Sequence, residues 1–190
     1  MKQIIISLRM LGIMSLLLGL VYPLLITGIA RAAFPDGADG SLVGVDDTLR
    51  GSRLIGQQME GARWFHSRPS ATDYNMLPSG ASNLALTSRE LHEVVEARRM
   101  KFIIDNGLEA DAVVPAEMVF ASASGLDPHI SPAAARMQVG RIARARGFSR
   151  MQRQRLSDLV ESMTERPQFE ILGCARVNVF MLNLALDKLQ

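Results

Sequence analysis

The chain has 190 residues with 21 Lys or Arg and 19 Asp or Glu, which gives a formal net charge of +2. Three of the basic residues flank an apolar stretch near the N-terminus and leave 18 basic and 19 acidic residues for the remainder, so the charge gives no indication of nucleic acid binding. The single cysteine, Cys174, excludes an intrachain disulfide, and we expect its thiol to be buried and inert.

The apolar stretch runs from Met10 to Ala30 and holds no charged residue across 21 positions. As a helix it would measure about 30 Å, which is close to the hydrocarbon thickness of a bilayer. We therefore predict a transmembrane anchor helix at 1–33 and one extramembrane domain at 34–190. A cleaved signal peptide is the alternative, because Ala30-Arg31-Ala32 has the small-x-small form of a cleavage site, and cleavage would release a secreted binding domain.

The residues around and within this stretch favour an orientation and a role for the helix. Lys2, Arg9 and the terminal amine precede it, whereas Arg31 alone follows it closely. The positive-inside rule then predicts a cytoplasmic N-terminus and a domain outside the cytoplasm. Pro23 removes a backbone donor in mid-span and is expected to kink the helix. Small residues such as Gly28 favour packing against other membrane helices.

Strand signals come first after the anchor. The pattern predicts short strands at 41–45 and 50–57, and 64–68 is a third candidate. Residues 69–83 hold two prolines and show no hydrophobic periodicity, so we predict a long irregular loop. A loop of this kind inside a compact domain is often functional.

A long helix is predicted next, starting at Thr87. Thr87 and Glu90 can form a capping box, and Leu86 and Leu91 can form the hydrophobic staple in front of the same helix. Asn106-Gly107 is expected to end it, because Gly readily adopts the left-handed conformation of a helix C-terminus.

Capping signals also define two further helices. Ser131 is expected to cap a helix that runs to about Arg146, and Ser149 with Gln152 forms a capping box for a helix through about Met163. These helices carry seven arginines in a stretch without acidic residues: Arg136, Arg141, Arg144, Arg146, Arg150, Arg153 and Arg155. We interpret them either as solvated helix faces or as a basic surface that faces lipid headgroups or an acidic partner.

The last elements complete the fold class. Pro115 opens a predicted short helix through Val119, residues 177–179 read as a strand, and Leu182 and Leu186 repeat at helical spacing. The chain is therefore predicted to be α+β, with one N-terminal transmembrane helix and a mixed domain that holds a small sheet and several helices.

Catalytic chemistry has only a weak signal. Ser122, Ser124, Asp127 and His129 are the residue types of a hydrolytic triad, but they lie within eight residues and lack the context of a nucleophile elbow. A membrane-anchored envelope hydrolase that uses the 122–129 loop is the alternative to a structural loop of Asx and Ser turns. No metal site is predicted, because no histidine or cysteine pattern has metal-ligand spacing.

Many short segments in one order resemble the C subunit of the bacterial Kdp potassium-transporting ATPases. The resemblance runs from about residue 20 to 189 and rests on these segments: Val21-Tyr22-Pro23-Leu24, Phe34-Pro35, Gly40-Ser41-Leu42, Gly51-Ser52, Leu54-Ile55-Gly56-Gln57, Trp64-Phe65-His66, Arg68-Pro69-Ser70, Ser82-Asn83-Leu84, Ala121-Ser122-Ala123-Ser124-Gly125-Leu126-Asp127, Val177-Asn178-Val179 and Asn183-Leu184-Ala185-Leu186-Asp187.

The resemblance implies a non-catalytic accessory subunit of an inner-membrane complex, and the orientation predicted from the flanking charges would then place its domain in the periplasm. The implied partners are a channel-like subunit that binds potassium and a P-type subunit that hydrolyses ATP. The complex, rather than this chain, would then handle ATP and K⁺, so the chain itself is expected to bind no cofactor. The family's C subunit is described as a catalytic chaperone that raises the ATP affinity of the pump, and its nucleotide-contacting glutamine falls on Gln138.

Two loops, 69–83 and 121–131, carry dense matches to this family without a catalytic arrangement. Loops that are neither core nor active site are natural contact surfaces. The residues we predict to face partners, in the loops and in the anchor, are Pro23, Gly28, Arg68, Asp73, Asn83, Ser122, Ser124 and Asp127.

Overall fold

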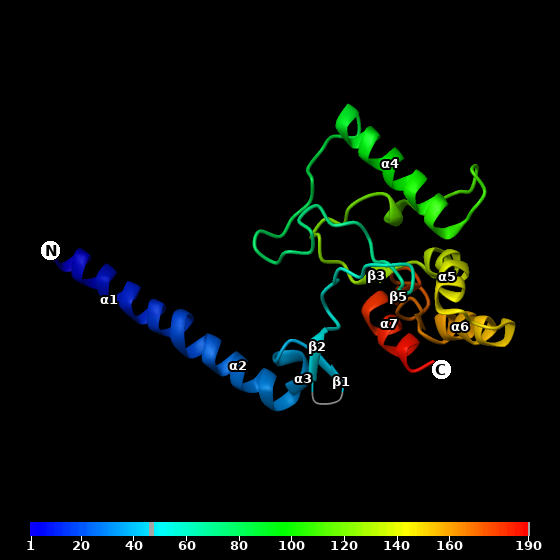
Figure 1. The fold of residues 1–190 in the computed structure, drawn as a ribbon. Coiled ribbons are helices and arrows are strands. Elements are labelled where there is room, and N and C mark those ends of the chain that lie inside the picture. The colour runs from blue at the N-terminus through cyan, green and yellow to red at the C-terminus, as the bar shows by residue number, and fades with distance from the viewer. Residues whose placement is uncertain (46–47, 190) are drawn as a thin grey trace. The chain divides into compact units, whose positions relative to one another are not determined.

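The structure is a computed structural model that describes residues 1–45 and 48–189. The chain divides into two compact units, Met1–Ser52 and the part from Arg53 onward (Figure 1). The first holds the apolar helix and a small hairpin, and the second holds helices around a small antiparallel sheet. This confirms the predicted α+β class.

The first unit is dominated by one continuous helical rod, formed by α1 (Lys2–Leu16), the π-helical turn η1 (Leu17–Val21) and α2 (Tyr22–Ala33). Its 32 residues are long and apolar enough to cross a membrane, and it is the one such helix in the described chain. The π-helical turn ends at Val21, two residues before Pro23, whose ring would clash with the carbonyl four residues earlier in a regular α-helix. The widened turn makes room for this ring, and the kink expected at Pro23 stays a prediction.

The rest of this unit is short. After α3 (Pro35–Ala38), strands β1 (Leu42–Val45) and β2 (Thr48–Ser52) pair antiparallel with a bulge between Val43 and Gly44. The strand predicted at 41–45 is confirmed. The strand predicted at 50–57 is wrong beyond Ser52, because Gly56 instead donates one isolated hydrogen bond to the carbonyl of Leu126.

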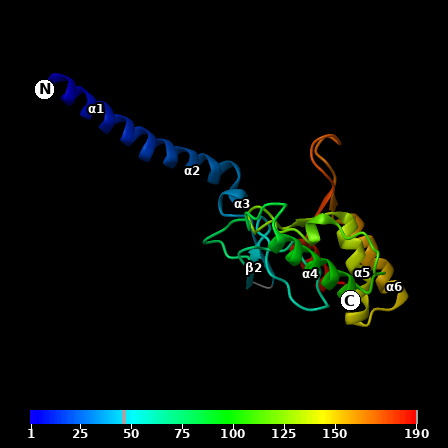
Figure 2. The same cartoon turned by 90° about the horizontal axis from the view of Figure 1, so that it is seen from above.

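The second unit packs three helices around the small sheet. Strands β3 (His129–Ile130), β4 (Thr164–Glu165) and β5 (Arg176–Asn178) are antiparallel in the order β3-β5-β4. Helices α5 (Pro132–Arg146), α6 (Arg150–Ser162) and α7 (Val179–Asp187) surround it, and α5 and α6 lie side by side (Figure 2). Fully buried side chains fill the space between them: Phe65, Ala134, Ile142, Leu156, Val160, Val177, Leu182 and Leu186.

The predicted caps of α5 and α6 are confirmed. The Ser131 hydroxyl accepts from the Ala134 amide, and Ser149 with Gln152 forms both halves of its capping box. The left-handed Gly147 ends α5. The short helix predicted after Pro115 is present as the 3-10 turn η2 (Ala116–Met118).

The predicted start of helix α4 (Arg89–Asn106) is off by one residue. Its N-cap is Ser88 rather than Thr87, because the Ser88 hydroxyl accepts from the Leu91 amide. Leu86 is 88% exposed, so it forms no buried staple. The end at Gly107, with a φ of 64°, is as predicted.

The candidate strand at 64–68 is wrong, and its replacement organises the second unit. Asn183 accepts from the Phe65 amide and donates to the Phe65 carbonyl, both at 2.9 Å. Gln138 does the same for His66, at 2.8 and 3.2 Å. Side-chain amides from α5 and α7 therefore form the hydrogen bonds that a neighbouring strand would otherwise form with the backbone amides and carbonyls of residues 65–66. The Phe65 ring is fully buried in the core.

We expect Asn183→Ala to lower the free energy of unfolding of the full chain in detergent by roughly 2–4 kcal/mol, because it leaves a buried donor and a buried acceptor of Phe65 without partners. Urea denaturation followed by circular dichroism measures it. The exposed Asn75→Ala is the matched control and should change stability little. Equal stability of the two variants would contradict the role given to Asn183.

Candidate functional site

The loops 69–83 and 121–131 lie against each other backbone to backbone. The Ser122 amide donates to the Pro69 carbonyl, and the Gly80 amide donates to the Ser124 carbonyl. Gly125 has a φ of 72°, and a Cβ there would lie 2.7 Å from the Thr72 hydroxyl. Only glycine fits this contact, so the two loops form one surface.

Loop 69–83 is held by its own polar groups. The Ser70 hydroxyl accepts from the amides of Thr72 and Tyr74, and the Tyr74 hydroxyl donates to the Arg68 carbonyl at 2.6 Å. Burial raises the pKa of Tyr74, which keeps its hydroxyl protonated as a donor. Asp73, Tyr74 and Asn83 all have positive φ. Asp and Asn tolerate this conformation better than most residues, which gives both a local structural reason.

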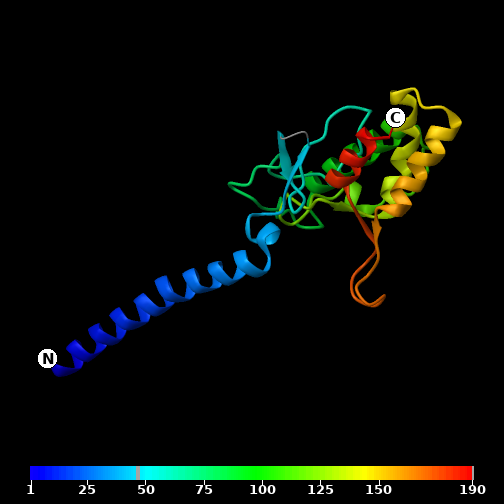
Figure 3. The same ribbon diagram turned by 90° about the horizontal axis from the view of Figure 1, so that it is seen from below.

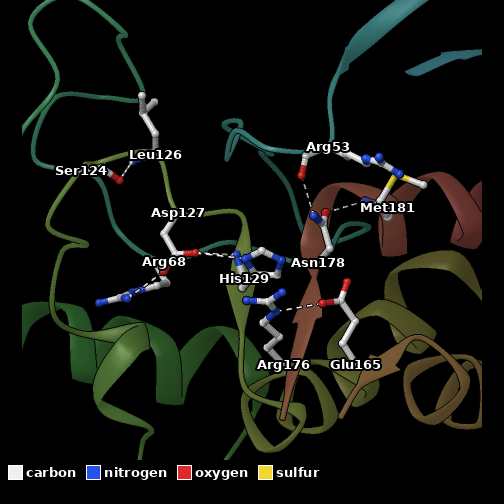
Figure 4. Close-up of polar contacts among 10 residues, drawn as sticks. All are labelled: Arg53, Arg68, Ser124, Leu126, Asp127, His129, Glu165, Arg176, Asn178 and Met181. Atoms are coloured by element: carbon white, nitrogen blue, oxygen red, sulfur yellow. Dashed lines mark hydrogen bonds and ion pairs between the residues drawn. The ribbon is translucent and has the colours of Figure 1, made fainter. Parts of the chain in front are cut away.

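Arg68 links the loops through Asp127 (Figure 4). The Arg68 guanidinium donates to the Asp127 carboxylate at 2.9 Å, and the other carboxylate oxygen accepts from the His129 amide at 3.0 Å. The His129 ring nitrogen Nδ1 lies 3.4 Å from the same carboxylate. On the neighbouring strand β5, Asn178 caps α7 and donates to the Arg53 carbonyl, and Arg176 pairs with Glu165 of β4.

A cavity of about 690 Å³ opens beside this cluster. Arg68, Asp127, His129 and Arg176 line it together with residues 166–168 and 172–175. Cys174 lies on its wall and is exposed, so the prediction of a buried thiol is wrong. Cys174 stands in a hairpin that projects from the domain, where no core covers it. The described residues include no cluster of three or more His, Cys, Asp or Glu able to hold a metal ion.

The four residues of the hydrolase alternative do not form a triad. Ser122 is buried, and the Ser124 hydroxyl accepts from the Leu126 amide. In the described part of the chain no hydrogen bond joins either hydroxyl to His129. Asp127 contacts both Arg68 and the His129 ring, but the described residues show no serine hydroxyl bonded to that ring, so the triad lacks its nucleophile–base contact.

Gln138 lies away from this surface and is fully buried. Its carbonyl oxygen accepts from the His66 amide and from Arg141, while its amide nitrogen donates to the His66 carbonyl. Arg141 also donates to the Trp64 carbonyl, and burial lowers the pKa of Arg141 to about 10. Every polar atom of the Gln138 side chain is therefore engaged within the domain.

The seven arginines divide into different environments. Arg141 is buried, Arg144 reaches the Asn106 carbonyl, and Arg146 lies over the Trp64 ring and pairs with Asp187. Arg136 forms a bidentate pair with Glu161. Those that remain exposed on α6 are Arg150, Arg153 and Arg155.

The structure brings the predicted loop residues together and leaves the anchor residues in the other unit. Arg68, Ser124 and Asp127 lie on one surface, and Asp73 and Asn83 are exposed on loop 69–83. Ser122 is buried beneath that surface, so the structure does not place it where it could face a partner. Pro23 and Gly28 belong to the helical rod, and a Cβ built on Gly28 would meet no other side chain of the described residues within 4 Å.

The sequence analysis did not predict that Asn183, Asn178 and Arg141 are buried and hydrogen-bonded inside the domain. Asn183 could have been suspected, since it interrupts an otherwise apolar run at a core position of the last helix.

We expect the stability of the domain to fall as the pH drops below 6.5, because burial first, and Arg141 second, lower the pKa of His66 beneath its ordinary value of 6.5. The unfolded chain then binds a proton that the folded chain does not, so stability is complete above pH 6.5 and is lost towards the lower folded pKa. Lys101, Asp105 and Arg141 face the ring.

Urea denaturation between pH 8 and pH 5 measures this dependence. In His66→Gln the slope of stability against pH should be reduced, whereas in the exposed control His92→Gln it should persist. An undiminished slope in His66→Gln would assign the dependence to other groups.

Residues 4–188 match the family described as "KdpC: K+-transporting ATPase, c chain". The potassium-transporting ATPase KdpC subunit of Cereibacter sphaeroides (strain KD131 / KCTC 12085) is 48% identical over 174 residues, which cover 92% of this chain and 90% of that one. The subunit of the same name from Pseudomonas aeruginosa (strain UCBPP-PA14) is 46% identical over 191 residues, 100% of this chain and 98% of that one. The chain therefore belongs to the KdpC family, and it is an accessory subunit of a K⁺-transporting ATPase rather than the enzyme that the hydrolase alternative required.

Proposed function

We propose that this chain holds and tunes the transport complex through two contacts. Its helix packs against membrane helices of partner subunits, and its domain docks outside the cytoplasm on a channel-like, potassium-binding subunit. The result is a higher affinity for ATP in the P-type subunit that hydrolyses it. In this proposal ATP and K⁺ are handled by the complex, and the chain is a single-pass protein of the inner membrane with a periplasmic domain.

The observation that carries the proposal is the interlocked surface of loops 69–83 and 121–131. It is built by backbone contacts around Gly125 and by the Arg68–Asp127 pair, and it contains no triad. A rigid polar surface without catalytic geometry is suited to positioning a partner. The 32-residue apolar rod supports the membrane contact, since its most apolar part buries nothing within the chain.

We further propose that Gln138 acts on nucleotide affinity indirectly. Its three hydrogen bonds hold His66 and Arg141, so a direct contact with ATP would first leave those buried groups unpaired. A periplasmic domain would also lie on the opposite side of the membrane from cytosolic ATP. An effect on ATP affinity would then pass through the membrane subunits that the chain contacts.

Removing this chain from the reconstituted complex is expected to raise the KM for ATP of K⁺-stimulated hydrolysis by between about 5-fold and 150-fold, the range typical of coupling between sites. Steady-state hydrolysis over a series of ATP concentrations measures it. Adding back the full chain should restore the KM, and adding back residues 34–190 alone should not. An unchanged KM and full coupling to K⁺ in the complex without the chain would refute the proposal.

A reporter fused after Gln190 tests the orientation. A reporter active only outside the cytoplasm should be active there, because the basic residues before the helix favour a cytoplasmic N-terminus. The same reporter placed before Lys2 is the control and should be inactive. The reverse pattern would place the domain in the cytoplasm.

A further inference from the structure

Residues 165–176 form a hairpin that projects from the second unit (Figure 3). At its base Glu165 pairs with Arg176, the last register position of β4 and β5. Near its tip Gln168 and Leu172 exchange two backbone hydrogen bonds of 2.9 Å. These bonds at both ends give the projecting segment a defined shape. We refer to it as the 165–176 hairpin.

The tip of the 165–176 hairpin is apolar and exposed. Phe169 is 85% exposed, Ile171 82% and Leu172 60%. Three neighbouring large apolar side chains at the end of a projection have no core to join. Contiguous apolar surface of this kind marks a contact site in a soluble domain.

The backbone of the turn at the tip is strained. Phe169 and Glu170 have φ values of 54° and 61°, and the Ile171 amide donates to the Gln168 carbonyl at 3.1 Å, which closes a turn with two central residues of positive φ, as in type I′. That turn favours Asn-Gly, since residues with a Cβ are strained at positive φ. Phe-Glu is therefore a poor sequence for the turn itself, and strain of this kind points to a function for the side chains.

We infer that the tip of the 165–176 hairpin inserts into an apolar recess on the extramembrane surface of the ion-carrying membrane subunit, with Glu170 paired to a basic group beside that recess. The inference rests on the proposed docking of the domain on that subunit and names the element that makes the contact. The chain is a subunit of a K⁺-transporting ATPase, and the one helix of its described residues that is long and apolar enough to cross a membrane cannot line an ion path alone. A larger membrane subunit is therefore present to receive the tip.

The negative charge of the tip favours a protein partner over two alternatives, a lipid surface and a second copy of this chain. Glu170 stands between Phe169 and Ile171, so a lipid surface would have to take up a carboxylate next to anionic headgroups. Two copies of the chain meeting tip to tip would bring their Glu170 side chains together. A recess on a protein can offer apolar contacts to the side chains of Phe169 and Ile171 and a cationic group to the Glu170 carboxylate.

The double substitution Phe169→Asn with Glu170→Gly tests the contact without endangering the fold. It installs the preferred sequence of the turn, so the isolated chain should unfold at the same or a higher urea concentration. Its affinity for the other subunits should fall at least about ten-fold, since it removes an aromatic anchor and a charge. Val113→Asn changes an equally exposed apolar residue outside the hairpin and should bind as the wild type does.

The affinity is measured by competition with labelled wild-type chain for the complex of the remaining subunits. If the wild-type chain itself fails to bind, the proposed function fails. If the wild type binds and the double variant binds equally well, the hairpin inference alone is overturned.

Cys174 provides a second readout, because it is the one cysteine of the chain, is exposed and lies two residues from Leu172. Its rate of modification by N-ethylmaleimide should fall at least about ten-fold in the assembled complex relative to the chain in detergent. The rate should be unchanged in vesicles of phosphatidylethanolamine and phosphatidylglycerol that contain the chain alone. Protection in those vesicles would assign the tip to lipid, protection that rises with chain concentration would assign it to a second copy, and either would overturn the inference.

Discussion

The second unit depends on two side-chain amides that replace a β-strand. Asn183 and Gln138 each bond both the amide and the carbonyl of one residue in the extended segment 65–66. The segment is thereby fixed between α5 and α7, with Phe65 pointing into the core. Buried backbone groups must find partners, and without these amides the segment could not cross the core. The helices and the segment consequently stabilise one another.

The positions of the two candidate contact surfaces, the interlocked loops and the 165–176 hairpin, depend on that fixed segment. Arg68 comes two residues after His66, so the position of its guanidinium relative to Asp127 is set by the same amides. Asp127 in turn fixes the start of β3, and β3 pairs with β5 at the base of the 165–176 hairpin. The interlocked loops and the hairpin are therefore connected by short, bonded paths.

Elements with a local chemical signal could be predicted from the sequence. Ser131, Gly147 and the Ser149–Gln152 pair define the ends of α5 and α6 by hydrogen bonds within a few residues, and these predictions are confirmed. The start of α4 was off by one because Thr87 and Ser88 offer neighbouring hydroxyls, and packing is needed to choose between them. The long apolar helix near the N-terminus could be predicted from composition alone.

Features decided by distant partners could not be predicted in this way. The segment 64–68 has a strand-like sequence, but its partners are amides 72 and 118 residues further along the chain. Cys174 was expected to be buried because cysteine usually is, and its place in a projecting hairpin is a property of the tertiary fold. The grouping of Arg68 with Asp127, 59 residues apart, likewise needed the structure.

The π-helical turn at Leu17–Val21 changes which glycines of the rod face the same way. In a regular α-helix the sixteen residues from Gly12 to Gly28 would place these two glycines about 160° apart, because each residue turns the helix by about 100°. The whole π-helical turn lies between them and accommodates one extra residue, which removes about 100° from that angle and leaves the two about 60° apart. The widened turn therefore brings Gly12 and Gly28 towards the same side of the rod.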